Sequence, residues 1–413
     1  MPVNPEIVIT GTGVVSALGC GRAENLAALK AGRSGIAPVR YLQTALKDFP
    51  VGEVPLSDAE LAARTGAPAG WPRTALMSIL ALQEALQEAG LSEDGACPGA
   101  FARTGSRSDA SGHAPSSGCH QILISGTTVG GMDRTEKTFP AYSPHHGCGA
   151  VTDLAALFVG GFDDATTLST ACSSAANAFI YGANLLRAGR CRRVVVGGSE
   201  SLTDYHLHGF NSLMILDREP CRPFDASRAG LNLGEGAAYL VLETAEEAAR
   251  RGVKPLARLA GFGNACDAFH QTASSENGEG AFLAMQKALR MAGLSAEEID
   301  YVNAHGTGTP NNDASESAAL RRIFGDKMPP VSSTKAFTGH TTSASGSIEA
   351  VFCLLALQEG FIPPQLHWHS PDPACITPWH AAASLCHEAS LRHVLSNAFG
   401  FGGNDTSLIF SRL

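Results

Sequence analysis

The sequence predicts an α/β protein built from two similar halves. Apolar runs typical of strands alternate with amphipathic runs typical of helices, an order that produces mixed or parallel sheets covered by helices on both faces. Each half opens on an apolar run that contains two glycines two positions apart, at residues 6–13 and 256–263. Each then has an amphipathic stretch that finishes in Ala-Gly-Leu-Ser, at residues 84–92 and 287–295. We therefore divide the chain into halves of residues 1–255 and 256–413.

The remaining elements follow in the same order in both halves. We expect the opening strand of each half to end at its pair of glycines, and the amphipathic helix to end at a glycine cap. A helix rich in small residues is predicted from Cys172 to about Arg187, with its counterpart at residues 346–359. Apolar runs at 193–198 and 393–398 predict one more strand in each half. Residues 104–120 are rich in Ser, Gly and Ala without a hydrophobic period, which predicts an exposed loop.

Composition excludes several classes of function. The chain of 413 residues has a formal net charge of −9, which argues against nucleic acid as a partner. No stretch approaches the roughly eighteen uninterrupted apolar residues of a membrane helix, and the first residues lack the pattern of a signal peptide. The 11 cysteines include no CxxC pair, which argues against a disulfide framework and a zinc site. We expect a cytoplasmic protein.

Cys172 is the candidate nucleophile. It follows a polar turn and stands where a helix rich in small residues begins. Unpaired backbone N–H groups and the positive end of the helix dipole at such a position favour the thiolate, which is the nucleophilic form. A buried and unreactive cysteine is the alternative, and for a cysteine considered alone it is the better one. Two histidine motifs further along the chain reverse that preference.

His305 lies at the end of a predicted strand and is followed by alternating Gly and Thr, which let a ligand approach the backbone. His340 precedes the second small-residue helix, the place that Cys172 occupies in the first half. If a pseudo-twofold axis relates the halves, the two helix starts meet. Lys335 and Glu349 flank His340 and are expected to pair, because isolated buried charges are costly. A capped turn and two surface charges are the alternatives for these motifs.

The last motif is the glycine-dense turn around Phe401. Such a turn can direct backbone N–H groups at an anionic centre, as an oxyanion hole requires, although a simple hairpin has a similar sequence.

In order and spacing, the motifs resemble those of the elongating β-ketoacyl-acyl carrier protein synthases. They are TACSS at 170–174, RPFDASR at 222–228, AHGTGT at 304–309, SSTK at 332–335, GHT at 339–341 and NAFGFGG at 397–403. The resemblance implies a thiolase-like fold of five layers, α-β-α-β-α.

The resemblance also implies a reaction in two halves. Cys172 takes an acyl group from the phosphopantetheine of a carrier protein, and malonyl-carrier protein then loses carbon dioxide and attacks the acyl thioester. His305 and His340 would stabilise the enolate. The backbone N–H groups of Cys172 and Phe401 would form the oxyanion hole, with the Phe401 ring as a gate.

Supporting roles follow from the same resemblance. Lys335 and Glu349 would fix the histidines, and Thr307 and Thr309 would contact the pantetheine arm. No metal and no cofactor of its own is implied, because the phosphopantetheine belongs to the acyl carrier protein. The resemblance implies a homodimer, or a heterodimer with a chain-length factor. Docking of the carrier protein would use a local basic surface, for which the candidates are Arg64, Arg73, Arg134 and Lys137.

Three alternatives remain: a non-catalytic chain-length factor, a thiolase acting on coenzyme A thioesters, and a carrier-binding scaffold. Chain-length factors generally lack the cysteine that this chain keeps, and Lys335 and the HGTGT motif argue against a thiolase.

The chain also departs from the resembled family at several positions. Asn404-Asp405 replaces the more usual Thr-Asn or His-Asn, and His145-His146 lies in a divergent stretch that we interpret as a loop or interface rather than a metal site. Residues 210–217 are closer to synthases of aryl polyene pathways.

Overall fold

The computed structural model describes residues 5–91, 121–380 and 389–413, so the loop predicted at 104–120 lies outside the described residues. Within them, the strands form one mixed sheet in the order β4-β3-β5-β6-β1-β7-β11-β10-β8-β9, with β2 paired to β1. The strands are β1 (Ile7–Ser16), β2 (Gly19–Cys20), β3 (Gln121–Gly126), β4 (Asp164–Leu168), β5 (Arg193–Glu200), β6 (Gly236–Thr244), β7 (Ala257–Cys266), β8 (Tyr301–Asn303), β9 (Val331–Ser332), β10 (His393–Gly400) and β11 (Asn404–Ser411).

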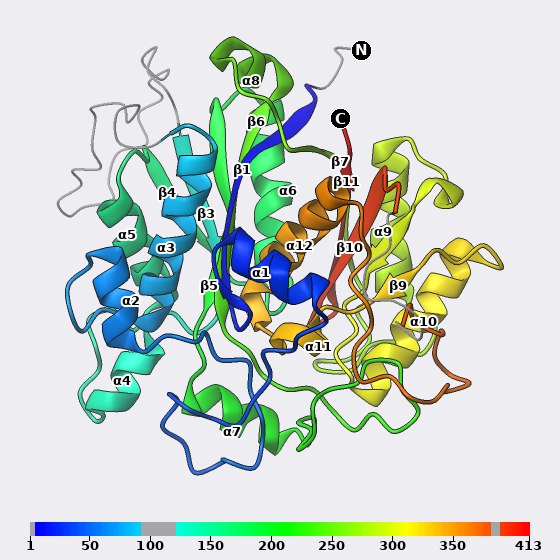
Figure 1. Ribbon diagram of the computed structural model, residues 1–413, viewed down its shortest axis with the longest axis horizontal. Helices are drawn as coiled ribbons and strands as arrows, with labels where there is room; N and C mark the ends of the chain where they lie inside the picture. The colour runs from blue at the N-terminus through cyan, green and yellow to red at the C-terminus, as the bar shows by residue number, and fades with distance from the viewer. Residues whose placement is uncertain (1–4, 92–120, 381–388) are drawn as a thin grey trace.

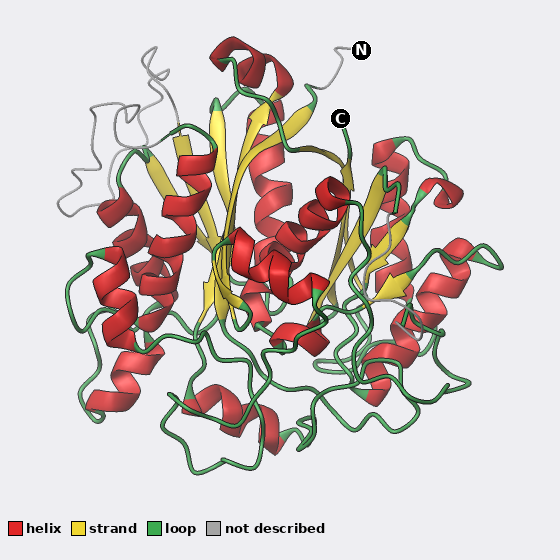
Figure 2. Ribbon diagram, viewed as in Figure 1, coloured by secondary structure: helices red, strands yellow, loops and turns green. Residues whose placement is uncertain are grey.

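The strands of the sheet form two groups, and helices lie between the groups (Figures 1 and 2). Its two halves join where β1 pairs with β7, through Val8 with Arg258 and Ile9 with Ala257. The helices of the first half are α1 (Arg22–Lys30), α2 (Asp58–Thr65), α3 (Arg73–Glu88), α4 (Met132–Thr138), α5 (Cys148–Val159), α6 (Ser174–Arg187), α7 (Asp204–Ser212) and α8 (Ala245–Arg251). Those of the second are α9 (Glu279–Ala292), α10 (Pro310–Phe324), α11 (Lys335–Thr338) and α12 (Ser345–Glu359).

The layers are the five that the sequence predicts. Helices α3 and α5 cover the outer face of the first half of the sheet, and α9 and α10 lie on the outer side of the second half. Helices α6 and α12 lie between the halves and contact strands of both. Their side chains, among them Phe179 and Phe352, form the largest buried apolar cluster. Among the described residues, none of the helices combines the length and the apolar character needed to cross a membrane.

The glycine pairs do not end their strands, so that prediction was wrong. Strand β1 continues to Ser16 and β7 to Cys266. A Cβ on Gly13 would lie 2.0 Å from the carbonyl oxygen of Ala81 in α3, and one on Gly263 would lie 2.2 Å from that of Ala284 in α9. The glycines therefore let a helix backbone lie directly against a strand, and both halves use the same packing.

The small-residue helices meet as the predicted symmetry requires. Helix α6 ends at Arg187, where the sequence places its end. A Cβ on Gly346, the second residue of α12, would lie 2.8 Å from both the nitrogen and the Cβ of Ala176 in α6. This close approach brings the start of α6 and the start of α12 to one point, and the candidate site opens there.

Candidate active site

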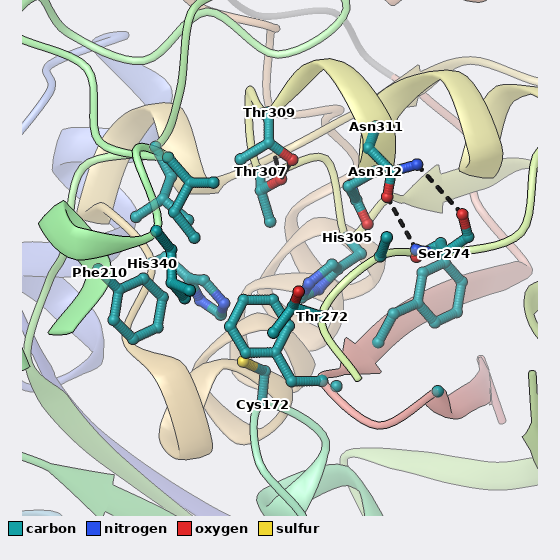
Figure 3. A pocket seen from close by; sticks show the side chains of 18 of the residues that line it. Cys172, Phe210, Thr272, Ser274, His305, Thr307, Thr309, Asn311, Asn312 and His340 are labelled. Atoms are coloured by element: carbon teal, nitrogen blue, oxygen red, sulfur yellow. Dashed lines mark hydrogen bonds between the residues drawn. The ribbon is translucent and has the colours of Figure 1, made fainter. Parts of the chain in front are cut away.

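The helix starts face a pocket with a volume of about 320 Å³. Cys172, His305 and His340 line it. Phe401, Thr307 and Thr309 line it as well. Figure 3 shows the cysteine and the two histidines reaching the pocket from separate segments, with Thr307 and Thr309 above them in that view. The structure therefore brings Cys172 together with two histidines that lie more than a hundred residues after it in the sequence.

A strained turn presents Cys172. Ala171 has a φ of 52°, in the left-handed region that residues other than glycine seldom occupy. The Ser174 hydroxyl, at the first residue of α6, holds the turn by donating to the Ala171 carbonyl at 2.6 Å and accepting from the Thr170 N–H at 2.9 Å. The cysteine thus stands just before the helix, and its side chain faces the pocket while only 5% of the residue is exposed.

The resting cysteine is a thiol. Burial raises the pKa of Cys172 to about 12, although Lys335 and the backbone N–H groups of Phe401 and Cys172 itself favour the thiolate. Desolvation outweighs these favourable charges and dipoles, so the stabilisation of the thiolate that we expect at the helix start does not lower the pKa of Cys172 below its ordinary value. The two N–H groups that act on the sulfur are nevertheless the pair expected to form an oxyanion hole.

Both histidines are neutral. Their ring centroids are 5.2 Å apart and the rings are almost perpendicular, at 85°. Burial, and then the positive charge of Lys335, hold the pKa of His305 and of His340 well below the ordinary value. The Thr342 N–H donates to Nδ1 of His340 at 3.2 Å, so this ring carries its proton on Nε2. A neutral imidazole with one N–H is a hydrogen-bond donor that brings no charge into the pocket.

Lys335 and Glu349 form the expected pair. Their Nζ and Oε1 atoms are 2.5 Å apart, and both side chains are buried. Burial raises the pKa of Glu349 to about 7, and Lys335 opposes the rise. The ammonium contributes to the low pKa values of both histidines, so the pair acts on the pocket electrostatically as well as structurally.

Phe401 and the two threonines form walls of the pocket. The Phe401 ring stacks on Phe210 of α7, with centroids 5.8 Å apart and planes inclined by 21°. Thr307 and Thr309 lie on another wall, with their hydroxyl oxygens 2.9 Å apart. Two hydroxyls that face the pocket beside a glycine can form hydrogen bonds with an elongated polar ligand that enters from outside.

The unusual Asn404-Asp405 pair preserves the support behind the glycine turn. Asn404 Oδ1 accepts hydrogen bonds from Ser173, Asn177 and Asn264 at 3.2, 3.0 and 2.9 Å. Burial, followed by the carboxylates of Asp267 and Glu316, raises the pKa of Asp405 to about 8. The carboxyl is therefore protonated near neutral pH, so it brings no negative charge behind the turn.

Two acidic residues that the sequence analysis overlooked hold the His305 motif. Glu316 accepts the backbone N–H groups of His305 and Gly306 at 2.9 and 2.8 Å. Asp313 accepts the N–H of Gly308 at 3.2 Å and is completely buried. The available signal was the spacing of these acids, which places both in the first two turns of the helix that follows the motif.

The four basic candidates for docking differ in burial and in their partners. Arg73 is buried, with Nη2 2.6 Å from Glu235, so its assignment to a docking surface was wrong. Arg134 and Lys137 both pair with Asp58, at 3.0 and 2.9 Å, and Arg64 is exposed.

The divergent stretch around His146 is held by local contacts. Nδ1 of His146 is 2.9 Å from the Thr135 hydroxyl oxygen. No group of three or more His, Cys, Asp or Glu residues is placed to hold a metal ion in the part of the chain that the structure describes.

Family models match both halves of the chain. The model described as beta-ketoacyl synthase, N-terminal domain, matches residues 4–248, and that of the C-terminal domain matches residues 256–369. The chain is 33% identical to nodulation protein E of Rhizobium meliloti (strain 1021), over 100% of both chains. It is 32% identical to 3-oxoacyl-[acyl-carrier-protein] synthase 1 of Haemophilus influenzae, over 98% of both.

Solved structures agree over the whole chain. The ishigamide ketosynthase/chain length factor superposes with a TM-score of 0.86 and 31% identity, covering 100% of both chains. The ketosynthase ApeO in complex with its chain length factor ApeC, from Xenorhabdus doucetiae, gives a TM-score of 0.80 and 28% identity, covering 100% of this chain and 99% of that chain.

Proposed function

The chain belongs to the β-ketoacyl synthase family, and from this premise we propose that Cys172, His305 and His340 carry out its condensation. Enzymes of this family are acyltransferases that form carbon–carbon bonds, and this chain is a 3-oxoacyl-acyl carrier protein synthase of fatty acid or polyketide type. One observation carries the assignment of residues. A thiol, two neutral imidazoles and two converging backbone N–H groups surround a single pocket.

In the first half-reaction, Cys172 attacks the thioester carbonyl of an acyl-carrier protein. The new bond joins its sulfur to the acyl carbon, the bond to the pantetheine sulfur breaks, and the cysteine proton leaves with the pantetheine thiol. The N–H groups of Cys172 and Phe401 stabilise the oxyanion of the tetrahedral intermediate. Because burial raises the pKa of the thiol to about 12, loss of its proton has to be coupled to the attack.

In the second half-reaction, malonyl-carrier protein occupies the same entrance. The bond to the carboxylate breaks, carbon dioxide leaves, and its electron pair forms an enolate on the thioester. His305 and His340 donate N–H groups to the enolate oxygen, and each neutral ring has one N–H for this bond. The enolate carbon then attacks the acyl carbonyl, and the Cys172 sulfur leaves and recovers a proton. Thr307 and Thr309 would hold the pantetheine arm in both halves.

We propose that the chain works as a dimer through the free edge of its sheet. Among the described residues, strand β4 ends the sheet order, and Leu157 of α5, the helix that packs on β4, is 53% exposed. Phe139 and Tyr142, in the segment after α4, are also exposed, at 70% and 68%. An unpaired strand edge flanked by exposed apolar groups is a surface that another sheet can cover. The partner would be a second copy or a chain-length factor, since two similar solved structures are a ketosynthase/chain length factor and a ketosynthase in complex with its chain length factor.

For the pathway, we propose polyketide-type synthesis, with the aryl polyene branch as the specific case. Support comes from identities of 31% and 28% to ketosynthases paired with chain length factors, and from the sequence at 210–217. Phe210 in that stretch stacks on Phe401, so the distinctive residues border the reacting centre.

The experiment is intact-mass analysis of the purified protein, alone and with its candidate partner, after exposure to a panel of acyl-carrier proteins and malonyl-carrier protein. The proposed function requires an acyl adduct on Cys172 that malonyl-carrier protein then removes as a lengthened product. Cys172→Ala should abolish the adduct, and Cys172→Gln should still release carbon dioxide from malonyl-carrier protein without condensation. An adduct that persists in Cys172→Ala, on another cysteine, would refute the assignment of the nucleophile. A protein without any adduct would instead indicate a chain-length factor.

A further inference from the structure

Glu200 is a buried carboxylate outside the pocket lining, and it has no part in the reaction described above. Glu200 is the last residue of β5 and is completely inaccessible to solvent. On one side it binds the segment that follows β3. It accepts hydrogen bonds from the Thr127 hydroxyl at 2.9 Å, the Thr128 hydroxyl at 2.6 Å and N–H at 3.0 Å, and the Val129 N–H at 2.8 Å.

The other side of Glu200 binds the turn after His340. Its Oε2 accepts from the Thr342 hydroxyl at 3.1 Å, from the Ser343 N–H at 3.4 Å and from the Ser343 hydroxyl. Because a backbone N–H can only donate, the Glu200 oxygens must act as acceptors on both sides. One buried carboxylate therefore connects a loop of the first half of the chain with the histidine turn of the second.

The backbone of the bound turn is strained. Thr342 has a φ of 43°, and a left-handed conformation is an outlier for a β-branched residue. Such strain persists only where the surroundings hold it. In this conformation the Thr342 N–H donates to Nδ1 of His340 at 3.2 Å, and this bond places the ring proton on Nε2. The Ser345 hydroxyl, 3.0 Å from the same nitrogen, completes the support of the ring.

We propose that Glu200 is a positioning residue for His340 in the malonyl half-reaction. By holding Thr342 in its strained conformation, it keeps the imidazole in the tautomer and orientation that donate to the enolate oxygen. The proposal rests on the proposed function, because it requires that His340 act on the malonyl group. It also predicts a selective defect. Acylation of Cys172 does not depend on the His340 proton, and loss of the Glu200 charge, which raises the pKa of Cys172, should not slow that step.

The test compares Glu200→Gln with Glu243→Gln. Glu243 is also completely buried, and it faces Arg193 at the far end of the β5–β6 pair, whereas Glu200 faces Gly236 at the pocket end. A glutamine cannot accept at both of its ends, so Glu200→Gln loses acceptors on one side while keeping the size of the side chain. Two single-turnover rates are measured by mass spectrometry: acylation of Cys172, and consumption of the preloaded acyl group by malonyl-carrier protein.

For Glu200→Gln we expect the malonyl step to slow by roughly tenfold to a hundredfold, as for a catalytic group displaced by a fraction of an ångström, with acylation near the parent rate. Glu243→Gln should alter the ratio of the two rates little. Adding Thr342→Gly to Glu200→Gln should restore part of the malonyl rate, because glycine adopts a positive φ without strain. Equal loss in both steps, or a malonyl rate unchanged by Glu200→Gln, would overturn the proposal.

Ser343→Ala decides the matter if Glu200→Gln does not fold. This change removes one hydroxyl from Glu200 and leaves the carboxylate in place, so a smaller loss confined to the malonyl step is expected. Loss of both steps in parallel would overturn the proposal. If the unmodified protein performed neither step, the proposed function would fail instead, so the two failures are distinguishable.

Discussion

Replacing Gly346 by alanine tests whether the contact between α6 and α12 sets the geometry of the active site. The new Cβ would lie 2.8 Å from the nitrogen and the Cβ of Ala176, whereas carbon atoms in contact are about 3.5–4.0 Å apart. The helices must therefore separate by roughly 0.7–1.2 Å. Since Cys172 precedes α6 and His340 precedes α12, the separation moves the nucleophile away from the imidazole.

The expected effect on activity is larger than the effect on stability. A misplacement of about 1 Å can cost on the order of 100-fold in rate. Overpacking costs about 1–3 kcal/mol, and the change from glycine to alanine in a helix returns about 1 kcal/mol. We therefore expect Gly346→Ala to lose roughly 0–2 kcal/mol of unfolding free energy while the condensation rate falls by on the order of 100-fold.

Gly149→Ala is the matched control. Gly149 is the second residue of α5, as Gly346 is of α12, but a Cβ there has nothing within 4 Å. This variant should gain helix propensity without loss of activity. The assay is single-turnover condensation by mass spectrometry, alongside denaturant unfolding of both variants. A Gly346→Ala protein that condenses at the parent rate would refute the argument that this contact fixes the reacting groups.

Four further outcomes are expected from the same structure. His305→Ala and His340→Ala should slow consumption of the preloaded acyl group more than they slow acylation of Cys172, because enolate charge develops only in the malonyl step. Single-turnover rates of the two steps check this. Lys335→Ala leaves its buried carboxylate partner unpaired, so it should cost about 3–5 kcal/mol in denaturant unfolding and slow both steps. Because the pKa of Cys172 is about 12, its alkylation rate should keep rising about tenfold per pH unit beyond pH 9, where a model thiol of pKa about 8.5 levels off. Arg64→Glu should slow acyl transfer from the carrier protein, most at low salt, and leave transfer from a small pantetheine thioester unchanged.

Local sequence was sufficient to predict the main elements of the site. The turn before a small-residue helix identifies the position of Cys172, and the same context in the second half identifies His340. Their meeting follows from the duplication, because equivalent helix starts lie together at a pseudo-twofold axis. The ion pair of Lys335 with Glu349 was predictable for a different reason, namely that neither charge can be buried alone.

Features that depend on distant residues could not be predicted. Arg73 looks like a surface charge in its own helix, and only its pairing with Glu235, the residue before β6, shows that it is buried. The glycine pairs look like turns until the carbonyl of Ala81 is seen against Gly13. Glu200 has no local motif, since its donors come from segments on either side of it in the sequence.

Burial and the Lys335 ammonium act on both Cys172 and His340, and the results differ because the two side chains carry opposite charges when ionised. The positive end of a helix dipole favours a thiolate and disfavours an imidazolium, whereas burial disfavours both. At His340, burial and the Lys335 ammonium therefore act in the same direction, and the imidazole is neutral. At Cys172 they act in opposite directions, burial prevails, and the sulfur keeps its proton until a thioester arrives. The scaffold thus holds uncharged groups in a buried pocket, and charge appears there only when the substrate supplies it.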